Sequence, residues 1–179
     1  MSRVDKSTKK RYKKIYRFYQ TRLNNLDTVI KDTNNRLITS DQYNYNCMSY
    51  AFGIYDKWLC LDCFDSSCDY SSVSADVDLE YLNDVFEDCC YELESRFNIR
   101  RLEDSKVKLN ADERMIAFRI GGDDFHFARK NSDGTWTHKP GCNYIREMSE
   151  DELLGEAWSE NSRPFPYISK VAFFAVKIK

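Results

Sequence analysis

The first 35 residues place apolar side chains at three- and four-residue steps. The positions are Tyr12, Ile15, Tyr16, Tyr19, Leu23, Leu26 and Ile30. This spacing forms one apolar stripe along a helix. Between residues 3 and 22 the chain also holds nine Lys and Arg side chains and a single acidic residue, Asp5. We therefore expect residues 1–35 to form a basic amphipathic helix.

Helical spacing returns in two later segments. In CMSYAFGIYDKWLCL, the residues Met48, Phe52, Tyr55 and Leu59 keep helical spacing, which puts Cys47 in the first turn of a helix. The second stripe consists of Leu79, Leu82, Val85, Phe86, Cys89, Leu93 and Phe97. Residues 61–104 hold 13 acidic and three basic residues. We interpret residues 60–104 as an acidic, Cys-containing helical insertion.

After this region the pattern changes to the alternation of strands. MIAFRI, FHFARK and TWTHK predict three short strands, separated by the turn strings GGDD and NSDG. Ser149 and Glu152 have the spacing of a capping box, which predicts a short helix over EDELLGEAW. The last segment, YISKVAFFAVKIK, has the apolar run of a strand that is buried on both faces.

Length and composition limit the class of protein. At about 150 residues per domain, 179 residues indicate one domain. Lys and Arg number 27 and Asp and Glu number 29, so the formal charge is 27 − 29 = −2, too balanced for a surface that binds nucleic acid throughout. No apolar run approaches the roughly 18 residues of a membrane helix, and the first residues lack the apolar stretch of a signal peptide. A cytoplasmic protein is expected.

Candidate chemistry centres on one cysteine and the only two histidines, His126 and His138. The first turn of a helix stabilises a thiolate, which favours Cys47 as a nucleophile. Alternation in FHFARK puts Phe125 and Phe127 on one face and His126 on the other, so the imidazole could project towards a helix end packed across that face. If NSDG is a four-residue turn, His126 falls within about one residue of pairing with His138. His138 could then orient His126.

This order of a helix-start Cys, a strand His and a polar residue one strand later resembles NlpC-type peptidases of the papain-like cysteine hydrolase superfamily. The strings that carry the resemblance are NCMSYAFG and FHFARKNSDGTWTHKPG. The same strings resemble uncharacterised proteins encoded by phages and bacteria. The resemblance implies a single α+β, papain-like domain over residues 1–179. In that fold a Cys-bearing helix packs on an antiparallel sheet, here with a helical N-terminal extension and a helical insertion.

The resemblance also implies roles for the three residues. Cys47 would be the nucleophile, His126 the general base and acid, and His138 the orienting group. The expected activity is that of a cysteine hydrolase or acyltransferase. It would act without a cofactor on an amide or thioester bond of a peptide or acyl-amide substrate. If a phage encodes the chain, the expected location is the host cytoplasm.

An acyl-transfer site also needs hydrogen-bond donors for the oxyanion. The amide of Cys47 is one candidate, and the side chains of Gln42 and Asn46 are two more. The neighbouring side chains of Tyr43, Asn44 and Tyr45 compete for this role. The alternative for Cys47 is that it packs as a small apolar residue, because unpaired cysteines are among the most buried residues.

The remaining cysteines raise the question of zinc. Cys60, Cys63 and Cys68 form CxxCxxxxC, and CxxC pairs suit tetrahedral zinc sites. A fourth ligand is missing, because Cys89 lies on the apolar stripe of its helix and adjacent Cys90 points about 100° away. We expect buried or loop thiols and no metal.

The rival to an enzyme is a non-catalytic binding protein on the same fold, encoded by a phage or a bacterium. The basic helix of residues 1–35 could contact RNA, a membrane surface or an acidic partner, or dock on the acidic residues 61–104 of the same chain. A host protein is the expected partner of the binding protein, and nucleic acid is not.

Overall fold

The fold is taken from a computed structural model. The model describes residues 45–55, 57–62, 79–121, 124–140, 145–159 and 166–178, together with the backbone of two short strands at 29–31 and 37–39. Gln42, Cys63 and Cys68 lie outside the described residues, as do residues 1–28 of the predicted basic helix.

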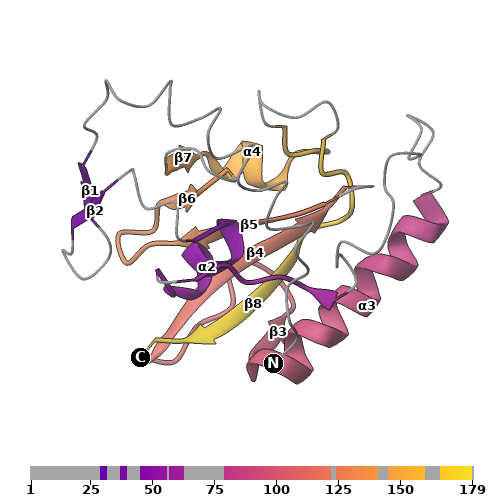
Figure 1. The fold of residues 1–179 in the computed structure, drawn as a ribbon, viewed down its shortest axis with the longest axis horizontal. Coiled ribbons are helices and arrows are strands. Elements are labelled where there is room, and N and C mark those ends of the chain that lie inside the picture. Colours follow the sequence, from indigo (N-terminus) through magenta and orange to yellow (C-terminus); the bar gives the residue numbers. More distant parts are fainter. Residues whose placement is uncertain are drawn as a thin grey trace.

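A six-stranded antiparallel sheet forms the centre of the described structure (Figure 1). In spatial order its strands run β3-β8-β4-β5-β6-β7. Their bounds are β3 Arg100–Leu102, β4 Glu113–Ile120, β5 Phe125–Lys130, β6 Trp136–His138, β7 Arg146–Met148 and β8 Ala172–Lys177. A separate two-stranded sheet pairs β1, Val29–Lys31, with β2, Leu37–Thr39.

Alternation of side chains along the strands gives the sheet two apolar faces. On one face, Phe118 and Phe127 pack against residues of α2 (Cys47–Phe52) and α3 (Leu79–Phe97). On the other face, Ala117 and Ala128 pack in a second cluster with residues of and around α4 (Glu150–Leu154). The C-terminal strand β8 lies between β3 and β4 and contributes to both clusters. This confirms the prediction of a strand buried on both faces.

Helix α2 is short and has a defined cap at each end. The Asn46 side chain accepts a hydrogen bond from the Ser49 amide at 3.0 Å, as an N-cap residue does. The helix ends at Gly53, whose φ of 73° is a left-handed conformation that glycine adopts without strain. The predicted stripe that extended to Leu59 is therefore interrupted after Phe52.

A buried arginine joins α2 to the sheet. Arg129 of β5 lies under α2, with its guanidinium 4.0 Å from the centre of the Tyr50 ring. Its Nη1 donates to the hydroxyl of Tyr55 at 2.7 Å. The Tyr50 hydroxyl in turn is 2.8 Å from Thr137 Oγ1 of β6. These contacts fix α2 over β5 and β6.

The papain-like fold prediction was wrong. The described chain is mainly a six-stranded antiparallel sheet with few and mostly short helices, and it lacks the predicted helical insertion. Residues 100–102, assigned to that insertion, form the edge strand β3. Helix α3 places Leu82, Phe86 and Leu93 in the main core because its stripe matches the apolar face of β4 and β5. It is part of the domain core.

The predicted end of the N-terminal helix also needs correction. Residues 29–31, which lie within the expected helix of residues 1–35, form strand β1. Tertiary pairing with β2 has overridden the local helical spacing that included Ile30.

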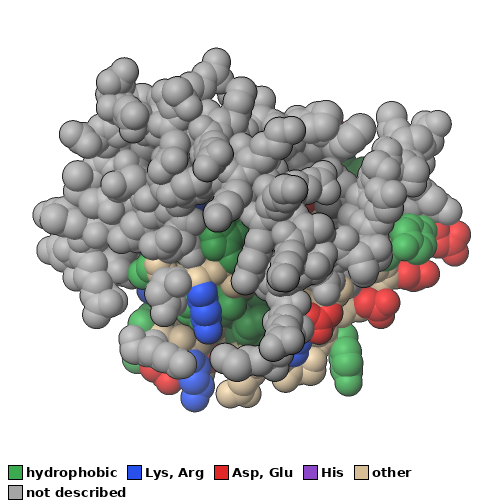
Figure 2. Space-filling view, in the orientation of Figure 1, with side chains coloured by type: hydrophobic (Ala, Val, Ile, Leu, Met, Phe, Trp, Pro, Cys, Tyr) green, Lys and Arg blue, Asp and Glu red, His purple; other side chains and the backbone are tan. Residues whose placement is uncertain are grey.

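The outer surface of α3 is acidic (Figure 2). Exposed residues along this helix include Glu80, Asp84, Asp88 and Glu94. Glu87 instead pairs with Arg101 and Lys170, with closest contacts of 2.6 Å to each. Among the described residues, no helix is long and apolar enough to cross a bilayer.

The capping box of α4 is confirmed and supports a stability prediction. The Ser149 hydroxyl accepts from the Glu152 amide at 3.1 Å, and the Glu152 carboxylate accepts from the Ser149 amide at 2.7 Å. Replacing Ser149 with alanine should lower the free energy of unfolding by about 1 kcal/mol, because the first turn loses its acceptor. Urea denaturation would measure the change. Ser149→Asp restores a capping oxygen and should recover most of it; equal losses in both variants would contradict a capping role.

Candidate functional site

Cys47 begins helix α2, as the spacing predicted, and faces the apolar core. Its side chain is 6 % exposed and packs in the cluster that contains Phe125 and Phe127. Its Sγ lies 3.8 Å from the carbonyl oxygen of Phe125, to which the thiol donates. The thiol is thus held against the backbone of β5 among apolar side chains.

The oxyanion candidates do not form a donor pair in the described structure. Asn46 uses its Oδ1 to accept from the amide and the hydroxyl of Ser49, while its Nδ2 donates to the carbonyl of Leu59 at 2.6 Å. These three bonds commit the amide to capping α2 and anchoring the following loop. Gln42 lies outside the described residues.

The two histidines are together. His126 Nε2 and His138 Nδ1 are 2.8 Å apart, and both rings are buried, with 1 % and 7 % of the residue exposed. The His126 ring stacks on Tyr167 at 5.2 Å between centroids and meets the edge of Trp158 at 6.0 Å. Each side chain is therefore held in one orientation by its neighbours.

The structure does not bring Cys47 and the histidines together. Phe125 and Phe127 of β5 pack with Cys47 on the face that α2 covers. His126 lies between them in sequence and therefore projects to the opposite face, where it meets Trp158. The alternation was predicted correctly, but α2 packs on the phenylalanine face because its own residues are apolar. The sheet itself separates the thiol from the imidazole pair.

A third buried basic residue joins the histidines, and the sequence analysis missed it. Arg119 of β4 is directly opposite His126 of β5 and is 3 % exposed. Its Nη2 donates to the carbonyl of Gly155 at 2.8 Å, and its guanidinium lies 5.3 Å from the centre of the Trp158 ring. The signal in the sequence was an arginine at an inward position of MIAFRI. Its Nε and Nη1 are buried and have no hydrogen-bond acceptor among the described residues.

A cavity of about 280 Å³ opens beside the histidine pair. His138 of β6 and Arg146 of β7 line it from the sheet, and Glu152 of α4 and Trp158, which follows α4, line it from the other side. A second hollow, of about 480 Å³, lies next to it and shares the Glu152 wall. The buried His138 imidazole thus reaches a cavity.

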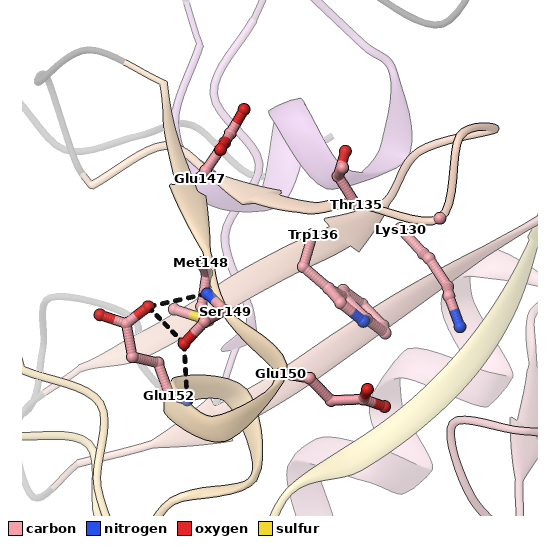
Figure 3. Close-up of a pocket in the computed structure, with 9 residues that line it drawn as sticks. Lys130, Thr135, Trp136, Glu147, Met148, Ser149, Glu150 and Glu152 are labelled. Carbon is pink, nitrogen blue, oxygen red and sulfur yellow. Dashed lines mark hydrogen bonds between the residues drawn. The ribbon is translucent and has the colours of Figure 1, made fainter.

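Figure 3 shows the larger hollow, whose lining includes the acidic residues Glu147, Glu150 and Glu152. The Glu152 carboxylate is engaged with the amide and hydroxyl of Ser149. Glu147 points away from Met148 and Trp136, towards the other side of β7. The neighbours of Glu147 in β7, Arg146 and Met148, share the face of His138.

The sequence matches the family described as a domain of unknown function, DUF7689, over residues 36–161. The chain belongs to this family. No curated protein and no solved structure matches the sequence. The matched region of this DUF7689 member includes Cys47, Arg119, His126 and His138. The family description states no activity, so function has to be argued from the geometry.

Burial decides the charge state of this site in the DUF7689 domain. Desolvation, together with the positive charge of Arg146, lowers the pKa of His138 to about 4, and the Glu152 carboxylate opposes this only in part. Desolvation lowers the pKa of Arg119 to about 10, so this guanidinium stays charged at neutral pH. At neutral pH the site therefore pairs a neutral imidazole with a buried positive charge.

The cysteines show no metal arrangement in the part of the chain that is described. No group of three or more His, Cys, Asp and Glu side chains is placed to hold an ion among these residues. Cys89 and Cys90 are buried in the core under α3, and Cys60 is exposed. Burial raises the pKa of Cys90 to about 12, which makes this thiol a poor ligand and a poor nucleophile.

Proposed function

We propose that this domain is a non-catalytic binding protein of the cytoplasm, with its ligand site at the cavity beside His138. The observation that carries the proposal is the separation of Cys47 and His126 on opposite faces of the sheet. A nucleophile and its general base must come within hydrogen-bond reach, about 2.6–3.2 Å. Bridging the two faces would require the central strand β5 to be rotated in the sheet.

The buried polar groups on the other face support a binding role. Burial of the charged Arg119 without a carboxylate partner among the described residues lowers the stability of the fold. The histidine pair beside it reaches a cavity. Perturbed titratable groups next to a cavity are typical of functional sites. The competing proposal is a hydrolase or acyltransferase that uses Cys47, His126 and His138.

A pulse of iodoacetamide near pH 6 separates the two proposals. An ordinary thiol with a pKa of 8.5 is only about 0.3 % thiolate at that pH, so only an activated thiol reacts quickly. In a binding protein Cys47 should react no faster than the exposed Cys60, because it is buried among apolar side chains. Peptide mapping by mass spectrometry would report both sites in one sample.

The matched control is His126→Ala, which removes the imidazole that an activated thiol would need. A binding protein should show the same Cys47 labelling rate in this variant as in the parent chain, provided that both remain folded by circular dichroism. If Cys47 is the fastest-labelled cysteine and slows when His126 is replaced, the binding proposal is wrong and the hydrolase proposal gains its support.

A further inference from the structure

Four basic residues lie on the same face of four neighbouring strands. Arg119 of β4 is directly opposite His126 of β5, and His138 of β6 is directly opposite Arg146 of β7. The 2.8 Å contact between His126 and His138 joins the two pairs into one row. The row begins under Trp158 and ends at the cavity of about 280 Å³.

The first member of this basic row carries a charge that nothing described neutralises. Arg119 contacts the carbonyl of Gly155 and the ring of Trp158, and desolvation by burial is the cause of its lowered pKa. Its Nε and Nη1 are buried without an acceptor. Gly155, whose carbonyl accepts from Arg119, and Trp158, whose ring its guanidinium faces, are both part of the cavity wall. The positive charge therefore lies directly behind that wall.

The other charged groups at the cavity do not cancel it. Arg146 adds a second positive charge from the exposed strand β7. Glu152 is the acidic side chain on the cavity side; its Oε2 accepts two hydrogen bonds from Ser149, which keep the carboxylate ionised, so it offsets the charge of Arg146 and leaves that of Arg119. Glu147 also lines the cavity, but its pairing with Thr137 places its side chain on the face of the sheet opposite that of His138. Within the described residues, the field at the cavity is positive on balance.

We propose that this cavity binds a small oxyanion group, a carboxylate or a phosphate, whose oxygens contact His138 and Arg146 while Arg119 supplies positive charge from behind the wall. The inference rests on the proposed binding function and gives its ligand class. A space of about 280 Å³ suits one small charged group and little more. Charge-assisted hydrogen bonds to imidazole and guanidinium are the usual means of holding such a group.

Histidine resonances in NMR spectra give a direct test, because His126 and His138 are the only two in the chain. Sodium acetate and inorganic phosphate are titrated separately into the full-length protein, with sodium chloride as the ionic-strength control. Acetate or phosphate should shift the His138 imidazole resonances saturably, and chloride should not. The anion that binds more tightly identifies the ligand group as a carboxylate or a phosphate.

The site also predicts that binding strengthens as the pH falls from about 7 to about 5. A bound anion stabilises the imidazolium form of His138, so anion and proton are taken up together. The charged groups that act on this imidazole are Arg146, which opposes its protonation, and Glu152, which favours it, while His126 contacts it through a 2.8 Å hydrogen bond. An affinity that is the same at both pH values would place the anion away from His138.

Three variants locate the charge that matters. Arg119→Met should weaken anion binding by about tenfold or more, since a charge in a low-dielectric wall acts strongly on its neighbours. Arg119→Lys keeps the charge and should retain most of the affinity. Lys108→Met removes the same charge from an exposed loop and should leave binding unchanged. If Arg119→Met and Lys108→Met lose equal anion affinity, the effect is one of net charge alone and the proposed site at the cavity is wrong.

Failure of this inference is distinguishable from failure of the proposed function. If neither anion shifts His138, the oxyanion site is wrong, whatever Cys47 does with iodoacetamide. If the anions bind as expected but Cys47 is labelled rapidly in a His126-dependent way, the site stands and the non-catalytic function is wrong.

Discussion

Replacing Arg119 with methionine should raise the free energy of unfolding by about 1–2 kcal/mol while it weakens anion binding. Burial lowers the pKa of this guanidinium from 12.5 to about 10, which corresponds to roughly 3 kcal/mol of unfavourable charge burial. Methionine has a similar length and carries no charge, so the penalty disappears. Loss of the bond to Gly155 and of the contact with Trp158 offsets about half of the gain.

Guanidinium chloride denaturation at neutral pH would measure this change. Arg146→Met is the matched control, because it makes the same substitution at an exposed position of the same basic row and should change stability by less than about 0.5 kcal/mol. Arg119→Ala should be less stable than Arg119→Met, since it also leaves a cavity. If Arg119→Met is clearly destabilised, the arginine is a structural element of the sheet, and its cost to the fold cannot be used as a sign of function.

The sequence predicted most individual elements because their signals are local. The alternation in MIAFRI and FHFARK, and the capping pair Ser149 and Glu152, depend on neighbouring residues only, and all became the expected elements. Helix α3 likewise follows its apolar stripe from Leu79 to Phe97. What these patterns do not contain is the side of the sheet on which each helix packs, since that depends on matching two apolar surfaces that are distant in the chain.

The side of the sheet on which α2 packs determines whether Cys47 can meet His126. The spacing of FHFARK places His126 opposite the phenylalanine pair whichever way the helices pack. The expectation of a Cys–His pair needed α2 on the histidine face, but the apolar face of α2 is stabilised by contact with Phe127 and Phe125. A resemblance that depends on residue order alone cannot distinguish these two packings.

The hairpin between β5 and β6 shows how one residue changes a site. A four-residue turn at NSDG would have paired residues 130 and 135, leaving His138 opposite residue 127 and on the wrong face. The loop is instead five residues long, and Lys130 pairs with Trp136. Asp133 stabilises it by accepting from the amide and the hydroxyl of Thr135. The added residue moves His138 to the face of His126, where the two imidazoles meet.

The stability of the domain should fall by about 3 kcal/mol between pH 6.5 and pH 4 through His138 alone. In the unfolded chain this imidazole takes a proton near 6.5, whereas in the folded domain burial and Arg146 lower its pKa to about 4. Over this range the unfolded state therefore binds more protons than the folded state, and stability declines as the pH falls. Below about pH 4 both states are protonated and the decline from this residue ends.

His138→Asn isolates the contribution, because an amide can still bond to His126 Nε2 but does not titrate. Near pH 7 the variant should be less stable than the parent, because asparagine makes a poorer hydrogen bond to His126. On acidification it should lose much less stability than the parent. Urea denaturation at half-unit pH steps would give both slopes. Hydrogen-bonded ion pairs lower the pKa of Glu87 and of Glu113 to about 2, so both begin to lose stabilisation near pH 4.5, but they do so equally in parent and variant and cancel in the comparison. Parallel slopes in parent and variant would show that folding does not change the pKa of the His138 imidazole, in which case burial does not hold this group neutral in the folded domain.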